Sequence, residues 1–172
     1  MTKTQELLQE LEQEARTTRR VLERVPADRL GWKPHEKSLS LGQLALHVAI
    51  IPGAVAELSQ KSSIPVPDFV HPSPASVAEL IPALDDSIAK ATVVLRSIDD
   101  AALGNIWRAM DGDKEVMALP VGALMRSIML NHWYHHRGQL LVYLRQVGVP
   151  VPSVYGPTAD ESPFARTAAA SR

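Results

Sequence analysis

Residues 121–147, VGALMRSIMLNHWYHHRGQLLVYLRQV, form the longest segment of the chain in which apolar side chains recur every three or four positions. Gly148 is a typical residue at a helix C-terminus, and Pro150 cannot continue the helix. The pattern therefore predicts one long helix that ends at Val147. An amphipathic helix of this length buries its apolar face, so the rest of the chain has to supply its partners.

Three further segments show the same periodicity. Helices are predicted at residues 4–25, from Ser40 to the start of a linker at residues 60–74, and from Ser73 or Ser76 to Ile98. The residues Ser40 and Gln43 have the spacing of a capping box, in which each side chain satisfies a free backbone amide. Four amphipathic helices joined by modest loops predict an all-α fold, a four-helix bundle.

Prolines and glycines interrupt this pattern at several points. Pro52-Gly53 lies inside the second predicted helix and is expected to kink or divide it. The linker at residues 60–74 contains four prolines. Asp111-Gly112 lies within residues 105–119, between two short alternating segments, and predicts a small β-hairpin between helices three and four.

Composition indicates a single globular domain. The chain has 172 residues, of which 45% are hydrophobic and 22% charged, with a net charge of −1. We expect one domain over residues 1–160 and a flexible tail over residues 161–172. Balanced charge gives no basic surface for nucleic acid. The charged N-terminus does not resemble a signal peptide, and no apolar run approaches 18 residues, so we expect a cytoplasmic protein without a membrane span.

Two histidines share the apolar face of the helix at 121–147. At about 100° per residue, His136 lies about 40° from His132, whereas His135 lies about 60° to the other side and points outward. His132 lies on the same face as Met129. Two histidines at positions i and i+4 can bind one metal ion.

A third histidine comes from a different helix. His47 lies on the apolar stripe of the second predicted helix, between Leu44 and Ile51. Three neutral imidazoles would leave open metal positions for water or substrate, as in catalytic sites. The alternative is that these are core histidines with hydrogen-bond partners. His35 and His71 lie in Pro-containing loops and are expected on the surface.

Three segments stand out beside the predicted ligands: SLGQLALH at 40–47, NHWYHHRGQL at 131–140 and VYGP at 154–157. Together they resemble the DinB-like superfamily, which includes YfiT-type proteins, bacillithiol transferases and mycothiol-dependent maleylpyruvate isomerases. The resemblance covers nearly the whole chain. It implies an up-down-down-up four-helix bundle, a homodimer, and one divalent metal ion, nickel or zinc, bound by His47, His132 and His136.

The resemblance also implies a class of chemistry. Known activities in the superfamily use a low-molecular-weight thiol for S-transfer or adduct formation on a small electrophile. Because the chain has no cysteine, such a thiol would be a cosubstrate. The alternatives are a hydrolase that uses a metal-bound water, and a non-catalytic metal-binding or interaction protein.

Several polar residues near the predicted ligands have open roles. Gln139 is expected either to hydrogen-bond a ligand histidine or to be a polar core residue. Arg137 is expected to form a salt bridge or an interface contact. Asp160 and Glu161 could approach the site, although a solvated tail is the simpler interpretation. The catalytic residue itself is not predicted.

Overall fold

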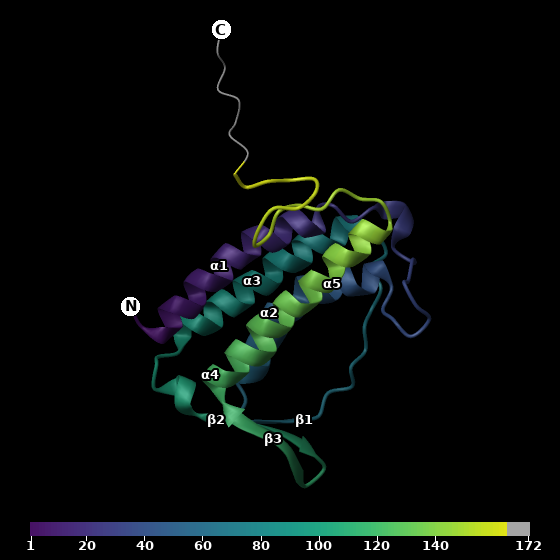
Figure 1. The fold of residues 1–172 in the computed structure, drawn as a ribbon. Helices are drawn as coiled ribbons and strands as arrows, with labels where there is room; N and C mark the ends of the chain where they lie inside the picture. Colours follow the sequence, from purple (N-terminus) through teal and green to yellow (C-terminus); the bar gives the residue numbers. More distant parts are fainter. Residues whose placement is uncertain (165–172) are drawn as a thin grey trace.

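The computed structural model describes residues 1–164 and consists of four long helices side by side with a small sheet at one end (Figure 1). The long helices are α1 (Lys3–Leu22), α2 (Leu41–Ser59), α3 (Leu80–Ser97) and α5 (His132–Gln146). The helices α1 and α5 run in one direction and α2 and α3 in the other (Figure 1). The Asp100 carboxylate, just after α3, accepts a hydrogen bond from the backbone of Thr4 at the start of α1. The topology is therefore up-down-down-up, as expected.

The segment predicted as one helix at residues 121–147 is continuous but not uniform. It begins as α4 (Val121–Leu124), continues as a π-helical segment, Met125–Asn131, and becomes α5. In the π-helical segment the backbone N–H of His132 donates to the carbonyl of Ser127, five residues earlier. This wider turn lies directly before the first histidine of α5. Such segments are frequent at functional sites.

The second helix begins as predicted, but it is not divided. The Ser40 hydroxyl and the Gln43 side chain form the reciprocal capping box. The helix then runs without interruption through Pro52 to Ser59, so of the two expected effects of Pro52-Gly53, a kink or a division, the division does not occur. A Cβ atom on Gly53 would lie 2.8 Å from the backbone of Ser87 in α3, so this glycine allows the two helices to approach closely.

The sheet has one strand more than expected. The predicted hairpin is formed by β2 (Ile106–Asp111) and β3 (Lys114–Pro120), which pair in antiparallel fashion. Gly112 has a φ of 57° in the two-residue turn, a conformation that glycine adopts readily. A third strand, β1 (Ser63–Pro65), pairs in parallel with β2. It lies in the Pro-rich segment that was predicted to be only a linker.

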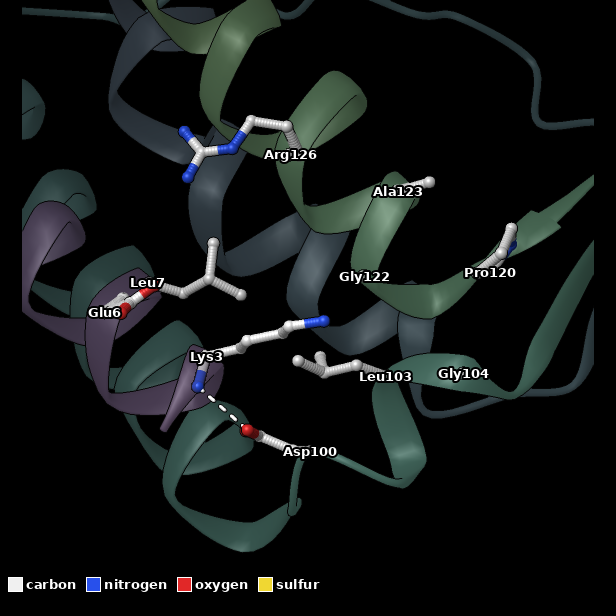
Figure 2. A pocket seen from close by; sticks show the side chains of 10 residues that line it. All are labelled: Lys3, Glu6, Leu7, Asp100, Leu103, Gly104, Pro120, Gly122, Ala123 and Arg126. Atoms are coloured by element: carbon white, nitrogen blue, oxygen red, sulfur yellow. Dashed lines mark hydrogen bonds between the residues drawn. The ribbon is translucent and has the colours of Figure 1, made fainter. Parts of the chain in front are cut away.

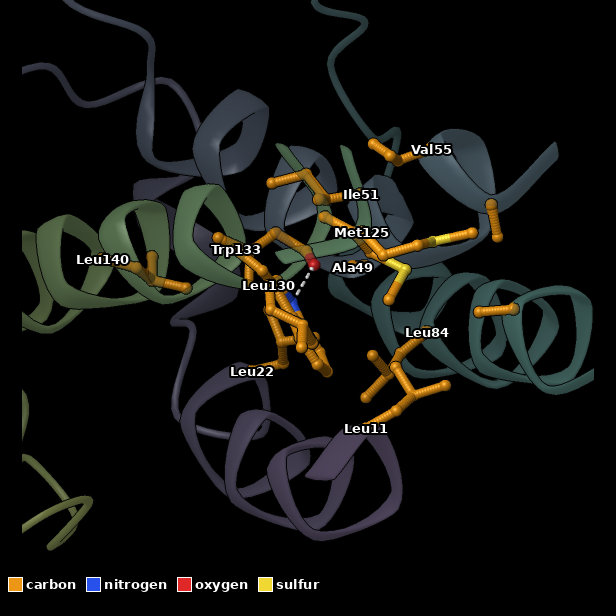
Figure 3. Close-up of a cluster of buried hydrophobic side chains, with 14 of the residues drawn as sticks. Leu11, Leu22, Ala49, Ile51, Val55, Leu84, Met125, Leu130, Trp133 and Leu140 are labelled. Atoms are coloured by element: carbon orange, nitrogen blue, oxygen red, sulfur yellow. Dashed lines mark hydrogen bonds between the residues drawn. The ribbon is translucent and has the colours of Figure 1, made fainter. Parts of the chain in front are cut away.

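The helix α2 contributes more buried residues to the hydrophobic core than any other long helix. Figure 3 shows buried side chains of all four long helices converging there, among them Leu11, Ala49, Leu84 and Trp133. With a mean hydropathy of 1.5, α2 is long and apolar enough to pass the length and composition test for a membrane span. However, 61% of that stretch is buried in the bundle, as in the core helix of a soluble protein.

The segment after α5 returns along the bundle and is fixed by ion pairs. The Asp160 carboxylate pairs with Arg145 and accepts a hydrogen bond from the backbone N–H of Val151. Glu161 pairs with Arg20 of α1. These carboxylates therefore serve in ion pairs that attach the segment to the bundle. Most of the tail predicted at residues 161–172 lies outside the described residues.

Candidate metal centre

The structure brings together His47 of α2 and His132 and His136 of α5. One ring nitrogen of each lies within 4.8 Å of the others, and all three side chains are partly buried. The Nε2 atoms of His132 and His136 face each other at 2.8 Å, so they converge on one point. The ring of His47 lies 4.6 Å from that of His136, between centroids. The group could hold a metal ion.

The electrostatic environment keeps these imidazoles neutral. Burial lowers the pKa of His47 to about 3, and the nearby His136 ring contributes to the shift. Burial also lowers the pKa of His136 to about 4. The pKa of His132 is lowered by the same cause, against the opposing effect of the Ile128 carbonyl. Neutral imidazole is the form that binds metal ions.

The hydrogen bond made by the outer nitrogen of His136 leaves its inner nitrogen available to bind a cation. The Gln139 carbonyl oxygen accepts a hydrogen bond from Nδ1 of His136 at 2.8 Å, which leaves Nε2 of that ring with a free lone pair. Within the part of the chain that the structure describes, Nδ1 of His132 is buried without a hydrogen-bond partner. The 2.8 Å contact between the two Nε2 atoms is a hydrogen bond when His132 carries its proton on Nε2, and a cation that replaces this proton would be bound by both lone pairs. The residues present therefore fit a divalent metal.

The two helices that carry the histidines are joined beside the site. The indole Nε1 of Trp133 donates a hydrogen bond of 2.8 Å to the carbonyl of Val48, marked by a dashed line in Figure 3. That carbonyl lies four residues before Pro52, which has no N–H to bond it. Because Pro52 cannot bond it, the Val48 carbonyl is free to accept from Trp133. Val48 follows His47 and Trp133 follows His132, so this hydrogen bond joins the two helices beside the histidines.

A buried ion pair fixes the face of α5 that packs against α1. Arg137 is only 1% exposed, and its guanidinium lies 2.5 Å from a carboxylate oxygen of Glu14 in α1. It also donates to the hydroxyl of Tyr155 in the C-terminal segment. Arg137 therefore points away from the histidines, and the predicted salt bridge is present. His135 is exposed, as expected; it hydrogen-bonds Gln139, and its ring lies 5.0 Å from that of His136, between centroids.

A cavity of about 480 Å³ opens beside the histidines. It lies between α2, the sheet and the segment after β1, and both His47 and His132 line it. His71 lines it too, with its ring 4.8 Å from that of His47, between centroids. The sequence analysis placed His71 on the surface. Its position depends on Gln43, whose side chain donates to the His71 carbonyl, and no local pattern indicates that contact.

A second cavity, of about 560 Å³, lies between the start of α1, the turn before β2, and α4 (Figure 2). The backbone N–H of Lys3 donates to Asp100 there, and Arg126 pairs with Glu10. No histidine lines this cavity. Its polar groups mainly connect parts of the fold, so the three-histidine site is the stronger candidate for chemistry.

A family model and solved structures point to the same family. The sequence model of the DinB family matches residues 1–167. The chain is 26% identical over 159 residues to the uncharacterized protein YrdA of Bacillus subtilis (strain 168), covering 90% of this chain and 89% of that protein.

Solved structures titled as DinB-like proteins have the same fold. One from Bacillus cereus ATCC 10987 has a TM-score of 0.66 and 24% identity, covering 87% of this chain and 95% of that one. Another, YjoA from Bacillus subtilis, has a TM-score of 0.63 and 19% identity, covering 91% of this chain and 98% of that one. From the family match over nearly its whole length, the chain belongs to the DinB family.

Proposed function

We propose that the protein binds one divalent metal ion, nickel or zinc, through His47, His132 and His136, and transfers a low-molecular-weight thiol to a small electrophile. The observation that carries the proposal is the convergence of three neutral imidazoles beside a cavity large enough for a small molecule. A divalent cation held there acts as a Lewis acid that lowers the pKa of a thiol or water beside it.

The residues of the chain would then hold and shield the reactants. The chain has no cysteine, so the nucleophilic sulfur has to come from a cosubstrate. Its thiol loses a proton to solvent and the sulfur forms a bond to an electrophilic carbon. In a substitution the bond from that carbon to the departing group breaks and its electron pair leaves with the group; in an addition the displaced π-electron pair takes up a proton from solvent. The apolar walls of the cavity exclude water, which favours attack by the thiol sulfur over attack by water.

A metal-dependent hydrolase is the second candidate. Attack by water usually requires a general base close to the metal, and His71, whose ring lies 4.8 Å from that of His47 between centroids, is the imidazole of the cavity wall that could serve. Among the described residues that line the cavity, Asp68 is the only carboxylate, and it is exposed. Asp160 and Glu161 are engaged with Arg145 and Arg20 instead. The third alternative, a non-catalytic metal-binding or interaction protein, predicts metal without turnover.

Elemental analysis of untagged protein tests the metal site. We expect about one nickel or zinc per chain, and less than about a tenth of that in His47→Ala, His132→Ala and His136→Ala, because two imidazoles bind a metal ion far more weakly than three. His135→Ala is the matched control, since its ring lies on the exposed side of the same helix turn. Metal that persists in His132→Ala, or is lost in His135→Ala, would contradict the assignment.

Activity is tested on protein loaded with each metal in turn. Loss of free thiol on incubation with an activated aryl halide reports S-transfer, and release of a phenol from an aryl ester reports hydrolysis. We expect the first reaction to require both the metal and the thiol. Ester hydrolysis without thiol would favour the hydrolase, and stoichiometric metal with neither reaction would favour the non-catalytic alternative. The implied homodimer is a separate proposal, which light scattering tests.

A further inference from the structure

The cavity beside the histidines has an unusually apolar wall. Its lining side chains come from α2, from the sheet and from the segment after β1, and include Ile50, Ala54, Leu58, Ile64, Trp107 and Met117. Trp107 is held in this wall by a hydrogen bond from its indole to the carbonyl of Leu58. Trp107 and Ile64 are themselves buried, so the inner wall is part of the packed structure.

The cavity also lacks positive side chains. Among the described residues that line it, Asp68 has the only formal charge, and neither lysine nor arginine is present. A carboxylate or phosphate that entered would lose water without gaining a counter-charge on the wall, and would meet the negative charge of Asp68. The wall therefore selects against anions everywhere except at the histidine end, where a bound cation could accept one polar group.

The rim of the cavity is apolar and exposed. Val66 is 44% exposed, Phe69 77% and Val70 78% on the segment after β1, and Val116 is 47% exposed on β3. Single exposed apolar side chains are ordinary, but a group of them around one cavity is typical of a binding site. The segment that carries Phe69 is attached at both ends, by the Val66 N–H to the Met110 carbonyl and by Gln43 to the His71 carbonyl.

We propose that this cavity binds the body of the substrate, and that the substrate is a neutral, apolar molecule small enough for a cavity of about 480 Å³, with a reactive group directed at the histidines. An acidic substrate does not fit the wall, because Asp68 is the only formal charge among the described lining residues. The placement of a reactive group at the histidines rests on the proposed function. The apolar selectivity of the wall does not, because it needs neither metal nor thiol.

Two fluorescent probes with one skeleton test the selectivity. N-phenyl-1-naphthylamine is neutral, and 1-anilinonaphthalene-8-sulfonate carries a sulfonate on the same rings. With metal-free protein, we expect the neutral probe to bind once per chain and at least ten times more tightly than the anion. Equal or tighter binding of the anion to the unmodified protein would overturn the proposal.

Substitutions locate the binding and test its cause. Ala54→Trp places a large side chain in the cavity from an exposed position of α2, and we expect it to weaken the neutral probe at least tenfold. Val93→Trp is the control, on an exposed position of α3 outside the lining. Val116→Lys adds a cation at the rim and should tighten the anionic probe several-fold while weakening the neutral one. Equal effects of Ala54→Trp and Val93→Trp would overturn the proposal.

The outcomes separate this inference from the proposed function. If the neutral probe binds as expected but no metal or thiol chemistry is found, the proposed function fails and the apolar site remains. If metal and thiol chemistry are found but the anionic probe binds better, the substrate class is wrong. The probe could also bind only under conditions in which light scattering shows that a dimer has dissociated. In that case a second copy of the chain covers the apolar rim, and the proposal is overturned.

Discussion

Gln139 orients one histidine of the site from the exposed surface. Its carbonyl oxygen accepts from Nδ1 of His136, and this bond selects the tautomer whose Nε2 is free for a metal. We expect Gln139→Ala to weaken metal affinity about tenfold to a hundredfold, as removal of such partners does elsewhere. Competition with a chromogenic chelator measures this. His135→Ala removes the other ring that Gln139 contacts, and should leave the affinity unchanged. An equal loss in both variants would contradict the proposed role.

The lowered pKa values of the histidines predict an acid-sensitive apo-protein. The unfolded chain takes up a proton on each histidine near pH 6.5, whereas His136 does so in the folded protein only at about 4 and His47 only at about 3. Between these values the unfolded state binds more protons, so the free energy of unfolding falls as the pH drops below 6.5. At pH 5 we expect a loss of about 1–2 kcal/mol for each of these two histidines.

Urea unfolding of metal-free protein at pH 7 and pH 5 checks this expectation. His136→Gln removes one titrating ring and keeps a polar side chain of similar reach, so the difference in stability between the two pH values should become smaller. His35→Gln is the control, because His35 lies on the exposed loop before α2. An apo-protein that is equally stable at both pH values would contradict the predicted protonation states.

At the scale of helices, the site depends on the contact between α5 and α2. Trp133→Phe keeps most of the buried ring but leaves the Val48 carbonyl without its donor, which costs about 1–3 kcal/mol of stability. Because Val48 and Trp133 each follow a histidine of the site, we also expect metal affinity to fall about tenfold, in line with other losses of ligand support.

The matched control for this substitution is Trp107→Phe. Trp107 also donates its indole N–H to a carbonyl of α2, that of Leu58, but neither residue neighbours a histidine of the site. Both variants should lose stability, measured by urea unfolding, and only Trp133→Phe should lose metal affinity, measured by chelator competition. If the two variants lose metal affinity equally, the Trp133 contact does not position the histidines.

Local patterns predicted the elements better than the contacts between them. The capping box of Ser40 and Gln43 and the turn at Gly112 depend on neighbouring residues, so the sequence alone indicates them. The π-helical segment before His132 was not predicted. The strand β1 was not predicted either, because it is short and is stabilised by pairing with β2, which lies far along the chain.

The same distinction applies to the site. The facing of His132 and His136 follows from helix geometry over one turn, so the sequence predicts their proximity. The approach of His47 requires the packing of α2 against α5, which the amphipathic pattern indicates only in general terms. His71 was missed because a side-chain contact from another element sets its position. The apolar character of the cavity was missed for the same reason, since its wall combines a helix, a sheet and a loop.

At the scale of the whole molecule, one buried ion pair connects the first helix, the last helix and the C-terminal segment. Arg137 bonds Glu14 and Tyr155, and its guanidinium lies 5.2 Å from the centroids of the Tyr134 and Tyr155 rings. A charge buried this deeply is stable only while it is paired. Glu14 and Arg137 therefore join the first and the last long helix. Removal of either residue alone leaves the charge of the other buried and unpaired.

We expect Glu14→Leu to lower the free energy of unfolding by about 3–5 kcal/mol, because it leaves the Arg137 charge buried and unpaired. The double variant Glu14→Leu with Arg137→Met removes both charges and should recover most of that loss. Asp85→Asn is the control: it breaks an exposed ion pair with Arg19 and should change stability by less than about 1 kcal/mol. Urea unfolding measures all three. If Glu14→Leu is as stable as Asp85→Asn, apolar packing holds the first and last long helices together and the buried pair contributes little.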